Sequence, residues 1–309
     1  MLEAAVVVLR LLQYAAGSVL MGSALFAIYA LPLHGPDSAA KSRWPRPLLI
    51  AAAGVLAVAA ALGLAAQTVV LAGSVEAGLT AEALWAVVGG MDLGMAALVR
   101  VLAAAAAFVV LLLARPGQAP WMPVVLLGTI AVASFGWMGH GATTEGVAGG
   151  YHLAADIVHA LTAAVWGGAL VAFVFLLHGR THLATLHGAL RRFSRIGIPL
   201  VAVLLLSGLV NAWFLVGLDG IARLVTTPYG LLLLAKLAMV AAMLVLAAAN
   251  RNRHTPAIEA EIAAAVPDPA NLVRLRRSIT LETALGLAVL TAVAWFGTLQ
   301  PIEHTIGHA

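Results

Sequence analysis

The sequence predicts an all-α polytopic membrane protein, a bundle of about eight transmembrane helices in a single domain. Of its 309 residues, 62% are hydrophobic and only 10% are charged, whereas soluble domains carry roughly 25% charged residues. A helix needs roughly 20 mostly apolar residues to cross a bilayer. The chain contains about eight runs of that kind with short polar connections, so one membrane domain is expected over residues 1–309.

Each expected span is an apolar run that ends at a polar break. The first run extends from Ala4 to Leu33, which is far longer than the roughly 7–15 apolar residues of a cleavable signal sequence. We therefore expect it to be kept as the first helix. In chain order, the expected spans are 5–33, 47–73, 91–114, 121–139, 152–178, 195–217, 229–250 and 277–299.

Basic residues are concentrated in alternate connections between these spans. The segments 34–46, 178–195 and 250–277 carry several Lys or Arg residues, whereas 74–90 and 140–151 carry none. Short loops rich in Lys and Arg stay on the cytoplasmic side of a membrane. The pattern predicts that both termini lie on the periplasmic side of a bacterial inner membrane.

The same features exclude several classes of protein. The net charge of +4 arises from basic loops whose positions follow membrane topology. We therefore expect the protein to be surrounded by a lipid bilayer and not to bind nucleic acid. The chain has no cysteine, which excludes disulfides and thiolate metal sites. Neither Lys41 nor Lys236 stands in a phosphate-binding G-x-x-x-x-G-K-[ST] motif. We expect neither ATP hydrolysis nor another enzymatic activity.

A candidate metal site lies at the outer end of the fifth span. His152, Asp156 and His159 have the spacing i, i+4, i+7, which places the three residues on one face of a helix. His140 ends the preceding span across a short glycine-rich loop and can approach the same face. Imidazoles with a carboxylate suit copper or zinc, and a nearby thioether such as that of Met138 favours copper, as Cu(I) or Cu(II).

Further candidates are weaker, because methionine on an apolar helix more often packs than binds a metal. Met91 and Met95 begin the third span, and His304 and His308 in the tail are either an entrance site or a solvated end. On the cytoplasmic side lie His178, His182 and His187. We expect these histidines to be exposed to solvent rather than to form a copper exit site.

Ionisable residues inside spans are costly and usually face a cavity or a partner. Besides Asp156 and His159, the expected spans contain Arg10, Arg100, Lys236 and Glu282. We expect these four residues to line a polar seam or to act as structural groups, for instance through pairing of Asp156 with Arg10 or Lys236. Glu282 is the best candidate for an acidic stop near the cytoplasmic side.

Several motifs, densest over residues 190–300, resemble the copper resistance protein D family. Upstream of that segment they are Leu98-Val99-Arg100, Gly139-His140-Gly141, and the stretch from Asp156 through His159 to Trp166-Gly167-Gly168. Within it they are Arg192-Phe193-Ser194, Ser207-Gly208-Leu209-Val210-Asn211, Thr227-Pro228-Tyr229-Gly230 with Lys236, Asn250-Arg251, Pro256, Arg276-Arg277-Ser278, Glu282, Gly286 and Pro301.

This resemblance implies an eight-span inner-membrane copper homeostasis protein that works with a periplasmic copper carrier of the CopC type and moves copper inward. Some relatives have methionine-rich outer segments, but this sequence has few methionines there. Histidines are therefore the main expected copper ligands. Copper binding at the periplasmic face by His140, His152, Asp156 and His159, followed by transport, is the resulting hypothesis.

Two alternatives remain open at this stage. In the first, His140 and His159 hold a haem near the outer face of a membrane oxidoreductase, since axial histidine ligation fits helical bundles. In the second, the chain is a copper-delivery or assembly partner that binds copper at its surface and transports none.

Overall fold

The computed structural model describes residues 2–32, 38, 44–115, 120–139, 146–179, 181–264, 268–299 and 302. Within these residues the fold is all-helical, and eight helices are long and apolar enough to cross a membrane. The predicted fold class is therefore confirmed. The eight candidate spans are Glu3–Tyr29, Pro45–Ala72, Asp92–Leu113, Trp121–Met138, Gly146–His178, Leu183–Val216, Pro228–Ala264 and Pro269–Phe296.

The first four spans are built from α1 to α7 with two irregular turns. The first span changes to a π-helix at η1, and the fourth tightens into a 3₁₀ turn at η2. The bounds are α1 Leu2–Ser18, η1 Val19–Ser23, α2 Ala24–Tyr29, α3 Pro45–Ala72, α4 Val75–Gly78, α5 Ala81–Gly90, α6 Asp92–Leu113, α7 Trp121–Ala133 and η2 Ser134–Met138.

The last four spans are longer than a bilayer requires. Their bounds are α8 Gly146–His178, α9 Leu183–Val216, η4 Ile221–Val225, α10 Pro228–Ala249, η5 Asn250–His254, α11 Thr255–Ala264 and α12 Pro269–Phe296. α9 begins 12 residues before the expected start at 195, and α12 begins eight residues before 277. Hydropathy marks only the apolar part of a helix, whereas Leu, Ala, Arg and Glu continue it into the polar region.

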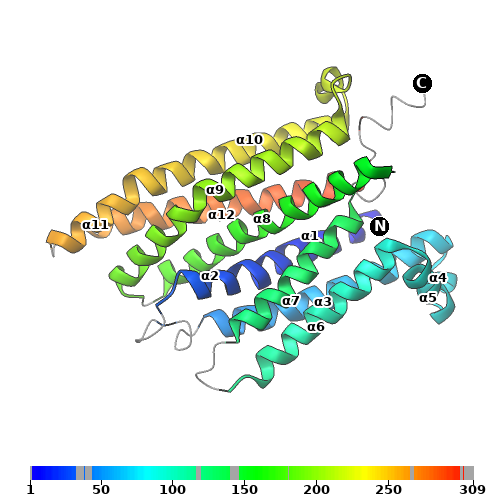
Figure 1. Cartoon of the computed structure of the whole chain (residues 1–309), viewed down its shortest axis with the longest axis horizontal. Coiled ribbons are helices and arrows are strands. Elements are labelled where there is room, and N and C mark those ends of the chain that lie inside the picture. Colours follow the sequence, from blue (N-terminus) through cyan, green and yellow to red (C-terminus); the bar gives the residue numbers. More distant parts are fainter. Residues whose placement is uncertain are drawn as a thin grey trace.

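The segment 74–90 was expected to be a loop, and it instead contains the short helices α4 and α5. The hydroxyl of Ser74 accepts a hydrogen bond from the Ala77 N–H, and that of Thr80 accepts one from the Ala83 N–H. These N-caps satisfy backbone donors that a short helix would otherwise leave unpaired. The connection is thus a compact helical hairpin at the end of the bundle where α6 begins (Figure 1).

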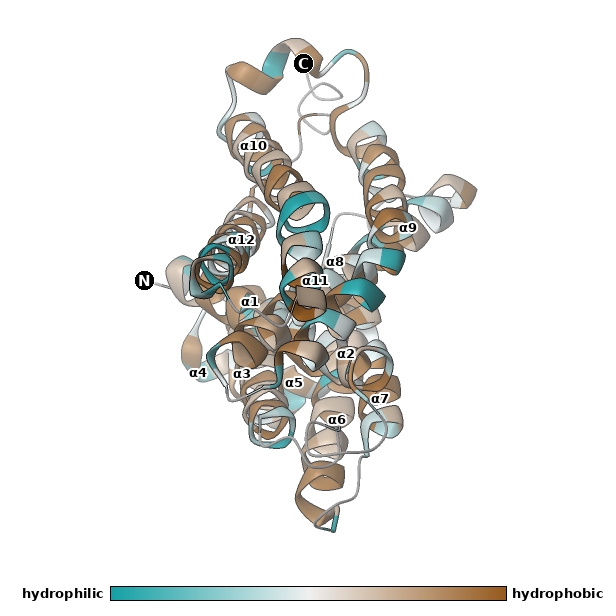
Figure 2. Cartoon of the chain, turned by 90° about the vertical axis from the view of Figure 1, so that its left-hand side faces the viewer, coloured by the Kyte–Doolittle hydropathy of each residue, from teal (hydrophilic) through white to brown (hydrophobic). Residues whose placement is uncertain are grey.

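The helices form successive layers, with α1 and α8 in the middle (Figure 1). α3, α6 and α7 lie on one side of this pair, and α9, α10 and α12 lie on the other. The apolar window of α8 is 56% buried, whereas those of α9 and α10 are 11% and 6% buried. Figure 2, which looks along the bundle, shows α9 and α10 standing apart at its periphery. α8 is therefore the central support of the fold.

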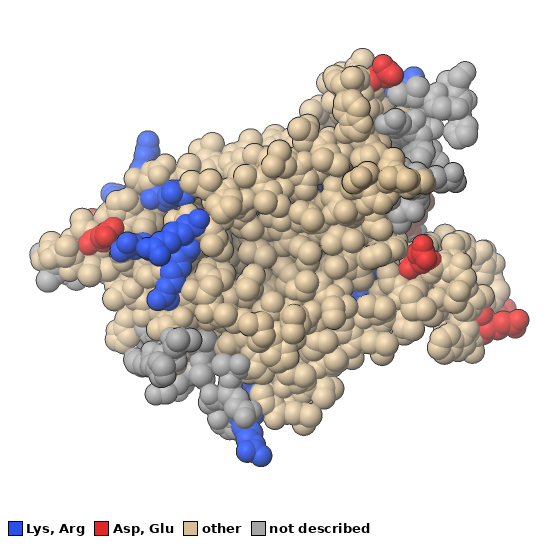
Figure 3. All heavy atoms as spheres, viewed as in Figure 1, with Lys and Arg blue, Asp and Glu red and all other residues tan. Residues whose placement is uncertain are grey.

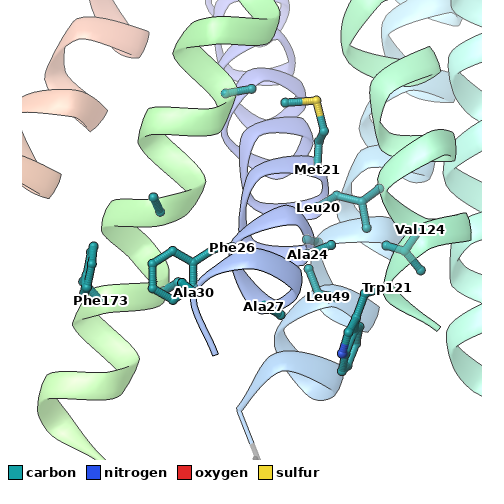
Figure 4. Packing of buried hydrophobic residues seen from close by; sticks show 14 of the residues in the cluster. Leu20, Met21, Ala24, Phe26, Ala27, Ala30, Leu49, Trp121, Val124 and Phe173 are labelled. Carbon is teal, nitrogen blue, oxygen red and sulfur yellow. The ribbon is translucent and has the colours of Figure 1, made fainter. Parts of the chain in front are cut away.

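The largest apolar core lies where η1, α2, α3, α7 and α8 meet (Figure 4). The rings of Phe26 and Phe173 pack edge to face with centroids 4.8 Å apart. Leu20, Leu49 and Val124 belong to the same cluster and are completely buried. Close van der Waals packing between such apolar side chains drives the association of helices inside a bilayer.

Two glycines set the distance between the first span and α8. A Cβ added at Gly22 would lie 2.1 Å from the carbonyl oxygen of Ala164, and one added at Gly168 would lie 2.5 Å from Gly22 Cα. The Ser23 hydroxyl donates a 2.8 Å hydrogen bond to the Gly168 carbonyl at the same crossing. Small residues let membrane helices approach this closely. This crossing fixes α1, which carries Arg10 and Tyr14, against the central helix.

Charge divides the two ends of the molecule. Arg191, Arg195, Arg251, Arg253, Arg274 and Arg277 all belong to the end formed by the start of α9, η5 and the start of α12. Figure 3 shows Lys and Arg gathered mainly at the left-hand end of the molecule, with Asp and Glu mainly at the opposite end. We call the end that carries these arginines the basic end.

Candidate functional site

A cavity of about 220 Å³ lies between α1, η2, α8, α9, α10 and α12, in the half of the bundle away from the basic end. Helices far apart in sequence contribute its polar groups. We call it the histidine cavity, and its ionisable and sulfur-bearing residues are Arg10, Tyr14, Met138, His152, Asp156, His159, Tyr229 and Lys236.

His159 has a defined orientation in this cavity. Its Nδ1 lies 3.2 Å from the carbonyl oxygen of Leu204 and 3.2 Å from the hydroxyl oxygen of Ser207. The Ser207 hydroxyl itself donates to the Val203 carbonyl at 2.7 Å, so both neighbours of Nδ1 act as acceptors. Nδ1 therefore carries the proton, and Nε2 keeps the lone pair that binds a metal. Metal-binding histidines are commonly held this way.

Asp156 lies one helical turn from His159 and is held from α9. Asn211 Nδ2 donates a 3.0 Å hydrogen bond to Asp156 Oδ1. The other carboxylate oxygen lies against the backbone of Gly139, where an added Cβ would be only 2.6 Å away. A side chain at position 139 would therefore displace the Asp156 carboxylate.

Two further polar atoms of this cavity are buried without a hydrogen-bond partner in the described part of the chain. They are Asn211 Oδ1 and the hydroxyl of Tyr229. An unsatisfied buried acceptor costs about 1–3 kcal/mol, and it is expected to bind water or a cation that enters the cavity. The cavity therefore has capacity for a polar guest.

His152 is almost fully buried, at 1% exposure, and its ring stacks on Phe214 with centroids 4.6 Å apart. Thus the i, i+4, i+7 face predicted from the sequence does line one cavity. His140, His304 and His308 lie outside the described residues. Within the described ranges, no three His, Asp or Glu side chains are close enough to share a metal ion. The structure brings His152, Asp156 and His159 to one cavity, not to one coordination sphere.

Two cations face the cavity. A guanidinium nitrogen of Arg10 donates to the Gly297 carbonyl, and Lys236 Nζ lies 5.6 Å from the centre of the Phe296 ring. The ion pairs found between described residues involve only His187, Arg191 and Glu259, so Asp156 forms no direct pair with Arg10 or Lys236. Both cations therefore contribute positive charge to the cavity.

The methionine candidates have different surroundings. Met138 lines the histidine cavity, but its sulfur accepts a hydrogen bond from Arg100. Met91 and Met95 are 40% and 49% exposed and do not line the cavity. Among the described residues, Met138 is thus the thioether beside the histidine face.

Arg100 is a structural residue of the neighbouring layer. It is 1% exposed, and its guanidinium donates to Gln13 Oε1 at 2.9 Å and to the hydroxyl and carbonyl oxygens of Ser134 at 3.0 and 2.8 Å. The Phe135 ring centre lies 4.4 Å from its central carbon. These contacts compensate the cost of burying the charge, and they join the first, third and fourth spans.

A second cavity, of about 450 Å³, lies between α8, α9, α10 and α12 nearer the basic end. Glu282 is 2% exposed there. Its Oε1 accepts a 2.9 Å hydrogen bond from Trp166 Nε1, and its Oε2 accepts a 3.0 Å hydrogen bond from Asn250 Nδ2. We call this space the glutamate cavity.

The histidines of the basic end are engaged locally. His187 Nε2 lies 3.6 Å from Glu259, and His178 Nδ1 bonds to the Val174 carbonyl one turn earlier. Neither lines the histidine cavity or the glutamate cavity.

Comparison with known proteins gives the family. The model for copper resistance protein D matches residues 187–296, and the model for the copper resistance protein D-like N-terminal domain matches residues 1–150. Copper resistance protein D of Pseudomonas syringae pv. tomato is 35% identical, over 96% of both chains. Inner membrane protein YebZ of Escherichia coli (strain K12) is 31% identical over 61% of this chain and 62% of its own.

Copper transport protein CutJ of Bacillus subtilis (strain 168) is 31% identical over 52% of this chain and 27% of its own length. No solved structure matches the chain. The full-length similarity, the two family models and the eight spans lead to one conclusion. The chain is a multi-pass membrane protein of the copper resistance protein D family.

Proposed function

We propose that this inner-membrane protein receives copper in the histidine cavity and carries it towards the basic end and the cytoplasm. Family membership supports a role in copper handling. The observation that carries the finer proposal is the hydrogen bonding of His159, whose Nδ1 faces two acceptors and leaves Nε2 available as a ligand.

We propose His159, Asp156, His152 and His140 as the ligands. Since no three of the described histidine and carboxylate side chains lie close enough to share an ion, these side chains must move when copper binds. Asn211 Oδ1 offers a further oxygen. Because Arg10 and Lys236 face the same space, a monovalent ion enters at a lower electrostatic cost than a divalent ion. We therefore propose Cu(I), the soft state that imidazole and thioether ligands accept.

The proposed orientation follows from the charge of the two ends. The positive-inside rule assigns the basic end to the cytoplasm, which leaves both termini and the histidine cavity on the periplasmic side. A soluble periplasmic carrier of the CopC type would then deliver copper directly to the cavity. We propose a transporter rather than an enzyme, with copper as its cargo.

Copper flux into liposomes tests this proposal. Purified protein is reconstituted, Cu(I) is supplied on the histidine-cavity side, and internal copper is measured for wild type, His159→Ala and the control His187→Ala. We expect His159→Ala to abolish flux and His187→Ala to retain it, because His187 lies outside both cavities. Copper bound without flux in the wild type would instead identify a delivery partner, and equal flux in both variants would exclude the histidine cavity as the entry site.

A further inference from the structure

The histidine cavity and the glutamate cavity lie on one seam, because the same four helices line both. On each of these helices, one residue is the last to line the histidine cavity and another is the first to line the glutamate cavity. In that order the pairs are Ala163 and Trp166 on α8, Gly208 and Val201 on α9, Lys236 and Leu244 on α10, and Val289 and Glu282 on α12. These pairs are three to eight residues apart in sequence, which at 1.5 Å per residue corresponds to about 5–12 Å along the helices. The barrier between the cavities is therefore thin compared with a bilayer core of about 30 Å.

One apolar cluster fills that interval. Trp166, Leu204 and Met243 are 4%, 8% and 7% exposed and pack together with Leu170, and Leu285 lies against this cluster. We call Trp166, Leu204, Met243 and Leu285 the plug, because these four come one each from α8, α9, α10 and α12 and lie between the two cavities. Leu170 lies one turn further along α8, where it lines the glutamate cavity. A dry apolar constriction of this kind stops ions, because an ion that loses its water there gains no polar partner.

The plug is tied to the glutamate cavity through Trp166. Its indole belongs to the plug, while its Nε1 donates to Glu282 Oε1 at 2.9 Å. Glu282 is held in turn by Asn250, the first residue of the π-helical turn η5. Single π turns within α-helices occur frequently at functional sites. A cation that binds Glu282 competes with the indole for the same carboxylate oxygen.

The plug also contains a ligand. Met243 places a thioether among its apolar neighbours, and thioether sulfur is a ligand that reduced copper accepts. Beside it, α9 packs on α8 and α10 packs on α12, whereas α9 and α10 have few contacts with each other. The seam thus combines a closed barrier, a soft ligand inside it and two helices that do not hold each other.

We propose that the two cavities are the two ends of one copper path and that Trp166, oriented by Glu282, closes the path between them, with Met243 as the intermediate ligand. This inference rests on the proposed transport function. Copper leaves the histidine cavity, passes the Met243 sulfur when the indole turns aside, and reaches Glu282, from which it is released at the basic end.

Cysteine labelling tests the barrier without copper, because the chain has no cysteine of its own. Ala212→Cys reports on the histidine cavity and Ala247→Cys on the glutamate cavity. Vesicles of either orientation are treated with a membrane-impermeant thiol reagent. We expect each cysteine to react only from its own end, and we expect Trp166→Ala to make Ala247→Cys reactive from the histidine-cavity end as well.

Leu176→Ala is the matched control, because Leu176 is a buried residue of the same helix that packs in the largest apolar core and lines neither cavity. It should leave the labelling pattern unchanged. If Trp166→Ala does not fold, Trp166→Phe keeps a ring but lacks the N–H that binds Glu282, and it should raise labelling from the far end above wild type.

Labelling of Ala247→Cys from both ends with Trp166 intact would overturn the proposal. The proposal would also fail if Ala247→Cys stayed unreactive from the histidine-cavity end in both Trp166 variants. Copper flux separates this failure from failure of the proposed function. Absent flux in the wild type contradicts transport itself, whereas wild-type flux that is unchanged in the Trp166 variants contradicts only the path through the plug.

Discussion

The indole nitrogen of Trp166 donates a 2.9 Å hydrogen bond to Oε1 of Glu282, although the two residues are 116 positions apart in the chain. Asn250 binds the second carboxylate oxygen. Asn250→Ala removes that donor and leaves Oε2 buried without a partner, which costs about 1–3 kcal/mol or more for a charged group. We expect a lower unfolding temperature in detergent. Asn252→Ala, at an exposed position of the same turn, should behave as wild type, and equal losses in the two variants would contradict this role of Asn250.

Ser207 orients His159 and does not itself face a proposed ligand position. Ser207→Ala removes one of the two acceptors at Nδ1 and retains the Leu204 carbonyl. Loss of such orienting partners lowers metal affinity by roughly 10–100-fold, and we expect the lower end of that range in a competitive Cu(I) titration. Thr291→Ala removes a similar hydroxyl from an exposed position of α12 and serves as the control. Unchanged affinity in Ser207→Ala would show that Ser207 does not fix the ring.

Lys236 should oppose copper binding. A unit charge about 8 Å from a second one repels it by about 2 kcal/mol at an effective dielectric constant near 20. Lys236→Leu removes that repulsion, keeps much of the side-chain volume and adds no metal ligand, so we expect copper affinity to rise by about tenfold or more. Arg195→Leu makes the same change of charge at the exposed basic end and should have no effect. A fall in affinity in Lys236→Leu would mean that Lys236 organises the site.

The crossing of the first span with α8 should tolerate no side chain. Gly168→Ala would place its Cβ 2.5 Å from the Gly22 backbone, and such overpacking costs about 1–3 kcal/mol. Gly150→Ala, on the same helix with open space around it, should be neutral or slightly stabilising, because alanine favours helix over glycine by about 1 kcal/mol. The unfolding temperatures of the two variants are measured side by side. An unchanged unfolding temperature in Gly168→Ala would show that the close contact between Gly168 and Gly22 does not matter for stability.

The eight spans could be predicted from the sequence because each depends on a contiguous apolar run. Their ends could not, since α9 and α12 begin within polar residues and α10 continues through η5 into α11. Hydropathy reports where lipid is needed, whereas helix propensity and capping determine where a helix ends. For the same reason the capped helices α4 and α5 were expected to be loop.

The candidate site was predictable in part. His152, Asp156 and His159 share a face because that relationship is local to one helix. Contacts between helices are not local, so the sequence did not reveal that Asn211 binds Asp156 or that Ser207 binds His159. Both residues were visible only as parts of a family motif. Trp166 too was visible only as part of a family motif, and its hydrogen bond to Glu282 was not predicted.

The most direct test of copper binding is the metal content and absorption spectrum of the purified protein, before and after loading with Cu(I). Wild type is compared with His159→Ala and the control His187→Ala. We expect near-stoichiometric copper in wild type and His187→Ala, a loss of that copper in His159→Ala, and no Soret band in any of the three. A Soret band that disappears in His159→Ala would instead assign the cavity to haem, and copper retained in full by His159→Ala would contradict copper binding in the histidine cavity.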